Sequence, residues 1–154
     1  MFRKILCPTD FSDCAAKALE YAKRLREAGT ESVIVIHVID TRTIMLTNTA
    51  WVGLTPAEYE EQLQRQVKKD AEKKLEGIKE EIENVGLRPS VRVLAGIPFS
   101  EIIKTAEDED VSLIVLGSHG RSNVKEMLLG SVSEKVVRKS KRPVLVVRRD
   151  TGSS

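Results

Sequence analysis

The sequence predicts an open, doubly wound α/β fold, in which a five-stranded parallel sheet is covered by helices on both faces. Short apolar runs alternate with segments of helical periodicity along the 154 residues, and this alternation is typical of parallel sheets. The runs are almost continuously apolar, as expected for strands that are covered on both faces. Crossover connections between parallel strands are right-handed, which favours the open doubly wound topology.

The first strand and the first helix are predicted near the N-terminus. The apolar run RKILCP, residues 3–8, ends at Pro8 and suits a short buried strand. Residues 9–29 have helical periodicity, with Ser12 as the N-terminal cap and Gly29 as the end of the helix. One face of this helix carries the apolar residues Ala15, Ala18, Leu19, Ala22 and Leu25.

The middle of the chain predicts a second strand and a long helix. Residues 32–40, SVIVIHVID, are almost continuously apolar and β-branched, which indicates a buried strand. Residues 41–56 show no clear period. The helix that follows is ended by Gly86 and Pro89. Its apolar positions step by three or four residues and are Tyr59, Leu63, Val67, Ala71, Leu75, Ile78, Ile82 and Val85.

The C-terminal half continues the alternation. Residues 90–95 predict a third strand, and residues 97–110 predict a helix with proline in its first turn. Residues 111–117, VSLIVLG, predict a fourth buried strand. After a glycine-rich stretch, residues 131–140 predict a helix and residues 143–149 a final strand.

Composition excludes several classes of protein. The chain is 41% apolar and 31% charged with a net charge of +2, so its overall balance indicates no nucleic-acid partner and no anionic membrane. No segment approaches the ~18 apolar residues that span a bilayer, and the first ten residues lack the features of a signal peptide. We therefore expect one cytoplasmic domain over residues 1–149, followed by a short polar tail, residues 150–154.

The two cysteines and one histidine are interpreted as structural residues. Cys7 and Cys14 are too far apart for a CxxC redox or zinc motif. Cys7 closes an apolar run and suits a small buried hydrophobic residue. His37 lies inside an apolar strand and is interpreted as a hydrogen-bonded core histidine rather than a ligand.

Residues 116–135, LGSHGRSNVKEMLLGSVSEK, contain three of the nine glycines of the chain. In an open parallel sheet, ligands bind beyond the carboxyl ends of the strands, where the strand order reverses. For the order 3-2-1-4-5, that point lies between the first strand, which ends in PTD, and the fourth, which ends in GSHG. Gly117, Gly120 and Gly130 are therefore predicted at the position where this architecture binds ligands.

A phosphate is the ligand that this stretch suits best. Glycine has no Cβ, so backbone N–H groups can approach an anion closely. Gly130 and Ser131 open a helix whose N-terminus is electropositive, and the hydroxyl groups of Ser131 and Ser133 could add donors. A second interpretation needs no ligand, because Ser131 and Glu134 are spaced as a capping box. The spacing excludes both a GxxxxGK[ST] phosphate loop and a GxGxxG dinucleotide fingerprint.

The glycine pattern Gly117-x2-Gly120-x9-Gly130-Ser131 resembles the ATP-binding signature of the universal stress protein family. Further segments that match this family in order are KILCPTDFS, HVID, AGIPFSEII and RPVLVVRR. The resemblance covers about residues 2–149. It implies the 3-2-1-4-5 Rossmann-like fold of the adenine nucleotide α-hydrolase-like proteins, usually dimeric, with ATP or another adenine nucleotide such as AMP as cofactor.

The resemblance also implies which residues form the nucleotide site. Pro8 and Thr9 would line the adenine side, and Asp10 would bond the ribose or lie near metal-bound phosphates. Val38 would offer its backbone to the adenine edge, and Gly96 would let the third connection pass close to the site. The residues that would wrap the ribose and phosphates are Gly117, Ser118, His119, Gly120, Arg121, Ser122, Asn123, Gly130, Ser131, Val132 and Ser133.

Three of these side chains keep more than one interpretation. Asp10 follows a strand directly and would also suit a helix cap. Beside phosphates, its carboxylate would need a bridging Mg²⁺ ion, because like charges repel. Arg121 would either meet phosphate or face water. His119 would stack on the ligand or donate a hydrogen bond to it.

The function that follows is a nucleotide-dependent regulatory switch in the stress response. Hydrolysis needs groups that orient water and neutralise the developing charge, and Asp10, His119 and Arg121 are not spaced as a recognised acid–base unit. We therefore assign no catalytic residue and expect a nucleotide-binding protein rather than an efficient enzyme. A slow or partner-stimulated, Mg²⁺-dependent ATPase is one alternative. The other is a protein-interaction module that binds no nucleotide and whose glycines are purely structural.

Two segments indicate protein partners. The apolar strand within residues 143–148 would lie at a sheet edge, where unpaired backbone groups invite another strand. We therefore expect a homodimer through this strand, in line with the family, and an unidentified downstream protein partner. Residues 41–56 include Met45, Leu46 and Trp51. They are apolar enough to cover the nucleotide, to dock a partner or the second subunit, or to pack locally.

Overall fold

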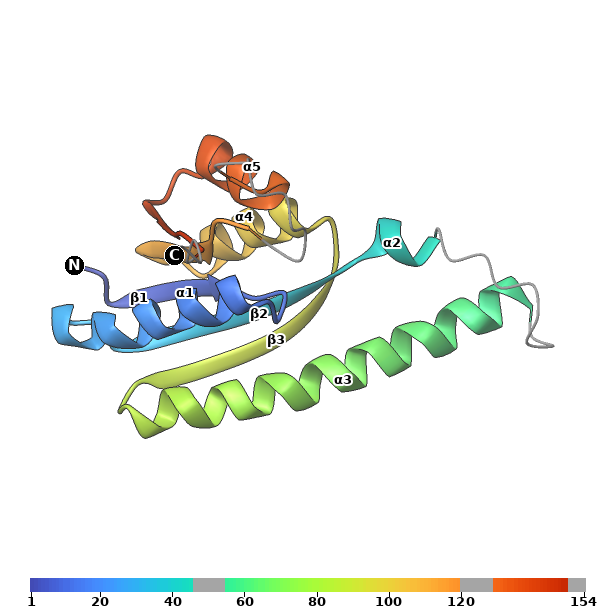
Figure 1. The fold of residues 1–154 in the computed structure, drawn as a ribbon, viewed down its shortest axis with the longest axis horizontal. Helices are drawn as coiled ribbons and strands as arrows, with labels where there is room; N and C mark the ends of the chain where they lie inside the picture. The colour runs from blue at the N-terminus through green and yellow to red at the C-terminus, as the bar shows by residue number, and fades with distance from the viewer. Residues whose placement is uncertain (46–54, 120–128, 150–154) are drawn as a thin grey trace, which may run out of the picture.

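Strands and helices alternate along the chain in the computed structural model, which describes residues 1–45, 55–119 and 129–149 (Figure 1). The strands are β1 (Lys4–Pro8), β2 (Ser32–Asp40), β3 (Arg88–Gly96), β4 (Leu113–Gly117) and β5 (Val144–Val147). The helices are α1 (Asp13–Arg24) with a 3-10 turn (Leu25–Ala28), α2 (Thr41–Met45), α3 (Pro56–Asn84), α4 (Pro98–Asp108) and α5 (Ser131–Lys139). None of the helices in these ranges is long and apolar enough to cross a membrane.

The strands form one five-stranded parallel sheet in the order β3-β2-β1-β4-β5. The predicted fold class and strand order are therefore confirmed. The pairing of β1 with β2 ends where Pro8 lies beside Ile36. The pairing of β2 with β3 continues until Asp40 lies beside Gly96. Residues 37–40 consequently pair with β3 alone, and they overhang the end of β1.

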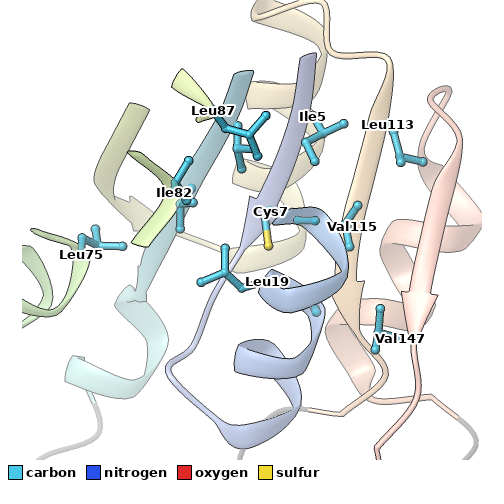
Figure 2. Packing of buried hydrophobic residues seen from close by; sticks show 13 residues of the cluster. Ile5, Cys7, Leu19, Leu75, Ile82, Leu87, Leu113, Val115 and Val147 are labelled. Carbon is cyan, nitrogen blue, oxygen red and sulfur yellow. The ribbon is translucent and has the colours of Figure 1, made fainter. Parts of the chain in front are cut away.

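Each face of the sheet has its own apolar core, because successive side chains of a strand point to opposite faces. On one face Cys7 packs with Leu19 of α1 and Ile82 of α3 (Figure 2). On the other face Ile36 packs with Ile102 of α4 and shares a core with Val136 of α5. Figure 1 shows α4 and α5 on the opposite side of the sheet from α3. Burial on both faces explains why the strands are almost continuously apolar.

The ends of the helices follow local capping chemistry. The Ser12 hydroxyl accepts a hydrogen bond from the Ala15 N–H at 3.2 Å, and Gly29 adopts a φ of 96° after the 3-10 turn. The predicted Ser12 cap is thereby confirmed, whereas α1 itself ends at Arg24 and Gly29 ends the 3-10 turn that follows it. Helix α3 begins at Pro56, earlier than the apolar period indicated, because Thr55 and Glu58 form a capping box ahead of the first apolar position.

Two further boundaries differ from the prediction. Strand β3 begins at Arg88 rather than at residue 90 and includes Pro89. The Arg88 N–H donates to the Glu31 carbonyl, so the alternation of the strand directs the nitrogen of Pro89 to the unpaired side, where no N–H is needed. Residues 41–45, for which no period was found, form α2, and residues 46–54 lie outside the described residues.

Cys7 makes the stability of the fold depend on pH at alkaline values. Complete burial raises the pKa of the Cys7 thiol from its ordinary 9.0 to about 12. Below pH 9 the thiol is neutral in both states, whereas between pH 9 and pH 12 only the unfolded chain releases the proton. The stability contributed by the neutral thiol is therefore expected to fall above pH 9, by about 1.4 kcal/mol per pH unit.

The measurement compares wild type with Cys7→Ala by urea unfolding at pH 8, 9 and 10. The stability advantage of wild type over Cys7→Ala should shrink over this range, because alanine has no proton to lose. A constant difference across the three pH values would contradict the expected effect of burial on the thiol.

Candidate functional site

A cavity lies at the carboxyl ends of β1, β2 and β4, where the strand order reverses. Its volume is about 280 Å³. The described residues that line it are Pro8, Thr9, Asp10, Ala15, Ile36, Val38, Pro98, Ile102, Leu116, Gly117, His119, Gly130, Ser131, Val132 and Ser133. Its walls combine the ends of apolar strands with the first turns of α4 and α5. This is the usual composition of a small-molecule site.

The loop between β1 and α1 forms one wall of the cavity. The Thr9 N–H donates to the Ile36 carbonyl at 2.9 Å, and the Phe11 N–H donates to the Thr9 hydroxyl at 3.0 Å. Phe11 has a φ of 64°, a left-handed conformation that costs about 1 kcal/mol or more in an aromatic residue. The two hydrogen bonds oppose this cost and hold Thr9 and Asp10 at the cavity.

Asp10 has one of its carboxylate oxygens engaged. Its Oδ1 accepts a hydrogen bond from the Ser12 N–H at 3.0 Å, while the Ser12 side chain caps α1. The interpretation of Asp10 as the helix cap is therefore wrong: the carboxylate orders the turn that precedes the cap.

Asp10 is the carboxylate at the cavity that could ligate a metal ion. It is the one carboxylate among the described lining residues. The described part of the chain contains no cluster of three or more side chains that could ligate a metal. A Mg²⁺ ion here would thus take at most Asp10 from these residues, and phosphate oxygens and water would supply the other ligands. Magnesium accepts such a set, since it often binds through one or two carboxylates plus phosphate.

Val38 lies in the part of β2 that overhangs β1, and its backbone hydrogen-bonding groups point to the side where β1 has ended. The Ile36 carbonyl points to the β1 side, because it accepts from the Thr9 N–H. Alternate residues of a strand direct their N–H and C=O to the same side. The N–H and C=O of Val38 therefore also point to the β1 side, where β1 has ended, and its side chain lines the cavity. One donor and one acceptor thus stand side by side at this edge.

The end of β4 is tied to the beginning of α5. The Ser118 carbonyl accepts two hydrogen bonds, one from the Gly130 N–H at 2.5 Å and one from the Ser133 hydroxyl at 2.8 Å. The Ser133 hydroxyl also reaches the Gly130 carbonyl at 3.0 Å. Its proton is therefore used within the protein, and of the two predicted serine donors only Ser131 is exposed.

The N-terminus of α5 opens into the cavity without a side-chain cap from the described residues. Gly130 is the N-cap residue, and Ser131 is the first residue of the helix. The capping-box interpretation of Ser131 and Glu134 is therefore wrong, because such a box needs Ser131 as the N-cap, whereas the helix begins one residue earlier, with Gly130 as the N-cap. The first N–H groups of a helix lack partners within it and carry partial positive charge.

Close packing accounts for two of the glycines. A Cβ on Gly117 would lie 2.8 Å from the Cys14 sulfur and 3.0 Å from the Cys14 carbonyl. A Cβ on Gly130 would lie 3.2 Å from the Ser118 carbonyl oxygen. Gly117 therefore lets β4 approach α1, and Gly130 lets the chain return to the end of β4, whether or not a ligand is bound.

The two histidines occupy different positions. His37 is partly buried, and its Nδ1 lies 2.8 Å from the Thr9 carbonyl oxygen. It is a hydrogen-bonded histidine, as predicted, and it does not line the cavity. His119 lines the cavity, and its Nδ1 lies 2.9 Å from the hydroxyl of Ser118.

Most of the predicted site residues that the structure describes meet at this cavity, with two exceptions. Ser118 is 1% exposed and lies behind the wall. Gly96, with a φ of 154°, lies against Glu101, and the same connection reaches the cavity with Pro98 instead. The predicted residues Gly120, Arg121, Ser122 and Asn123 lie outside the described residues.

Sequence reasoning missed the apolar part of the wall. The lining residues that it did not predict are Ala15, Ile36, Pro98, Ile102 and Leu116. The signal that could have found them is their position at the ends of strands and in the first turns of helices, which converge at the carboxyl edge of a parallel sheet.

Comparison with known proteins adds a family and a close structural match. The model of the universal stress protein family matches residues 1–148. Universal stress protein MJ0577 of Methanocaldococcus jannaschii is 45% identical over 97% of this chain and 96% of its own length. The solved structure of MJ0577 superposes with a TM-score of 0.89 and covers 99% of both chains.

Two more distant solved structures share the fold and hold nucleotides. A universal stress protein in complex with cAMP has a TM-score of 0.63 at 22% identity and covers 96% of this chain and 97% of its own. The universal stress protein from Archaeoglobus fulgidus in complex with dAMP has a TM-score of 0.60 at 20% identity and covers 96% and 98%. At these identities the likeness concerns the fold.

Proposed function

The chain belongs to the universal stress protein family, and from this premise we propose that it binds an adenine nucleotide in the cavity at the carboxyl ends of β1, β2 and β4. The observation that carries the proposal is the pairing of two binding elements in one cavity. The N-terminus of α5 has no side-chain cap from the described residues, and the N–H and C=O of Val38 point past the end of β1. The first suits a phosphate and the second suits a base.

The phosphate end of the ligand would lie at α5. Helix N-termini bind phosphate because several N–H groups point outward and the helix dipole favours negative charge. Ser131 is exposed there and could donate its hydroxyl. Asp10 faces the same cavity, and a Mg²⁺ ion between its carboxylate and the phosphates would relieve their repulsion.

The base end of the ligand would lie along Val38. Adenine carries an acceptor at N1 beside a donor at N6, which matches an N–H and a C=O on one residue. Guanine carries a donor at N1 beside an acceptor at O6, which opposes them. A site built from such fixed groups rejects a base with the reverse pattern, because polar groups would be left unpaired. The geometry therefore favours adenine over guanine.

Two relatives support the class of ligand. The family members solved with cAMP and with dAMP both hold adenine nucleotides on the fold shared with this chain. We propose ATP as the physiological ligand, because the open helix N-terminus suits a chain of phosphates, and AMP or a cyclic nucleotide as competitors. In this proposal the protein is a cytoplasmic regulatory switch, whose surface for a downstream partner depends on the bound nucleotide.

Slow hydrolysis is the second candidate function, and it rests on two side chains at the cavity. Asp10 and His119 both line it, and either could orient water. Each also has a structural hydrogen bond, to the Ser12 N–H and to the Ser118 hydroxyl respectively. These hydrogen bonds give each side chain a role in its own loop, so neither is assigned as a catalytic base. We therefore propose binding with slow or partner-stimulated turnover at most.

The test combines ligand identification with a binding series. Mass spectrometry of the small molecules released from denatured protein should detect an adenine nucleotide. Added ATP at 100 times its Kd should stabilise the fold by about 2.7 kcal/mol, and GTP should bind at least tenfold more weakly. Absence of a thermal shift with every adenine nucleotide would support the interaction module instead, and rapid multiple turnover by the pure protein would support the enzyme.

We also propose that the protein is a homodimer paired through β5. This strand is at the edge of the sheet, and Leu145 on it is 36% exposed. The Pro143 and Val147 carbonyls face β4, since they accept from Ile114 and Ser118. The backbone groups of Val144 and Val146 consequently face the free edge, where a second copy could pair with them.

Val146→Pro is expected to dissociate this dimer, because proline removes the outward N–H without removing a hydrogen bond to β4. Val146→Ala is the matched control, since it shortens the side chain but keeps the N–H. Light scattering at micromolar concentration should give a dimer for wild type and the alanine variant and a monomer for the proline variant. A monomeric wild type would contradict the proposed pairing.

A further inference from the structure

His37 lies where the hydrogen bonding between β1 and β2 stops. The Thr9 N–H donates to the Ile36 carbonyl at 2.9 Å, which extends the parallel pairing one residue beyond β1. In a parallel ladder, the next bond would run from the Val38 N–H to the Thr9 carbonyl. No hydrogen bond joins these two described groups. The Thr9 carbonyl is instead 2.8 Å from Nδ1 of His37.

The protonation of His37 follows from this contact. A carbonyl oxygen only accepts hydrogen bonds, so Nδ1 carries the proton and donates it. The imidazole ring also lies 4.6 Å from the ring of Phe11, centroid to centroid, and Nζ of Lys74 lies 4.9 Å from the Phe11 ring centroid. These contacts place the His37 side chain on the face of the sheet that α1 and α3 cover.

Val38, the next residue, belongs to the other face. Its side chain packs with the core beneath α4 and α5 and lines the cavity. His37 therefore does not line the cavity, yet it donates to the Thr9 carbonyl, which is the acceptor that a continued ladder would offer to the Val38 N–H. His37 thus acts from one face of the sheet, while the side chain of Val38 lines the cavity on the other.

We propose that His37 is a positioning residue for base recognition: by holding the Thr9 carbonyl oxygen on its own side, its imidazole keeps this oxygen from the Val38 N–H and leaves that N–H available to N1 of a bound adenine. This inference rests on the proposed adenine site. A partly buried carbonyl is seldom left without a donor, and continuing the register of β1 and β2 beyond Pro8 and Ile36 would pair the Val38 N–H with the Thr9 carbonyl. Without the imidazole, the ladder would close and withdraw the Val38 N–H from the ligand.

A matched pair of variants separates the donor from the shape of the side chain. Asparagine can place an amide nitrogen near the position of Nδ1, whereas leucine has a similar shape and no donor. His37→Asn should therefore preserve the arrangement, and His37→Leu should close the ladder.

The first measurement needs no nucleotide. Amide hydrogen exchange by NMR, referenced to the Ile36 amide of the same strand, reports whether the Val38 N–H is bonded. We expect fast exchange of Val38 in wild type and in His37→Asn, and exchange at least tenfold slower relative to Ile36 in His37→Leu. Slow exchange of Val38 in ligand-free wild type overturns the inference by itself, even if the leucine variant does not fold.

The second measurement compares affinities for ATP and for 1-deaza-ATP, which lacks the N1 acceptor. Wild type and His37→Asn should prefer ATP by roughly tenfold, the effect of one hydrogen bond. His37→Leu should bind both nucleotides with the same affinity. A preference for ATP that survives in His37→Leu overturns the inference.

The remaining outcomes distinguish this inference from the proposed function. A wild type that binds ATP and 1-deaza-ATP equally well overturns the role of Val38 and His37, while nucleotide binding stands. A wild type that binds neither nucleotide overturns both.

Discussion

Ser131→Glu is expected to weaken ATP binding at least tenfold while leaving the fold at least as stable as wild type. Ser131 is the first residue of α5, is exposed and lines the cavity. A carboxylate in the first turn of a helix interacts favourably with the helix dipole, by about 0.3–1 kcal/mol. The same charge would stand where the proposed site holds phosphate. We therefore expect affinity to fall at least tenfold, which corresponds to about 1.4 kcal/mol.

Ser131→Gln is the matched control, because glutamine has the size of glutamate without its charge. Calorimetry should show an affinity within a few-fold of wild type for the glutamine variant and an affinity at least tenfold weaker for the glutamate variant. The difference between the variants should narrow at high salt, which screens exposed charges. Equal losses in both variants would mean that bulk, rather than charge, excludes the ligand, and the phosphate would not lie at α5.

Gly117→Ala is expected to destabilise the fold by about 1–3 kcal/mol, because the added Cβ has no room. Two of the three nearest atoms belong to the backbone of Cys14, at 3.0 Å, so rotation of a side chain cannot relieve the contact. For a chain of this size, the melting temperature should fall by roughly 2–4 °C for each kcal/mol. Adding Cys14→Ala to the Gly117→Ala variant removes the sulfur that lies 2.8 Å from the new Cβ. The double variant should therefore recover part of the lost stability.

The same substitution at Gly77 should have the opposite effect on the stability of the fold. Gly77 lies inside α3, with nothing within 4 Å of an added Cβ. Alanine there should stabilise the fold by about 0.5–1 kcal/mol, because it lowers the entropy lost on folding. Thermal unfolding of the two variants therefore gives a paired measurement. A Gly117→Ala variant as stable as wild type would refute the packing role of Gly117.

Gly117 shows how far the glycine-rich stretch could be understood from its sequence. The pattern predicted correctly that the end of β4 and the start of α5 meet at the point where the strand order reverses. It did not reveal that Gly117 is also required by the packing of α1 on β4, since Cys14 is remote from it in sequence. The two needs coincide at one residue, so a glycine motif alone does not separate ligand binding from packing.

The capping box illustrates a second limit. Ser131 and Glu134 have the spacing of a box, but α5 begins at Ser131 rather than after it. The start of the helix is set by the Ser118 carbonyl, which binds both the Gly130 N–H and the Ser133 hydroxyl. The spacing of Ser131 and Glu134 shows only which local hydrogen bonds are possible. The Ser118 carbonyl, remote in sequence, determines where the helix actually begins.

The sequence by itself determined the alternation of strands and helices, the burial of the strands on both faces and, through the family motifs, the order of the sheet. The alternation and the burial depend on the periodicity of apolar residues, which is a local property, whereas the strand order followed from the resemblance to the family. Only the tertiary structure decided that the imidazole of His37 donates a hydrogen bond to the Thr9 carbonyl and that the Ser133 hydroxyl donates one to the Ser118 carbonyl. Hydrogen-bond partners are chosen by proximity in three dimensions, and several donors compete for each carbonyl, so no pattern along the chain specifies the outcome.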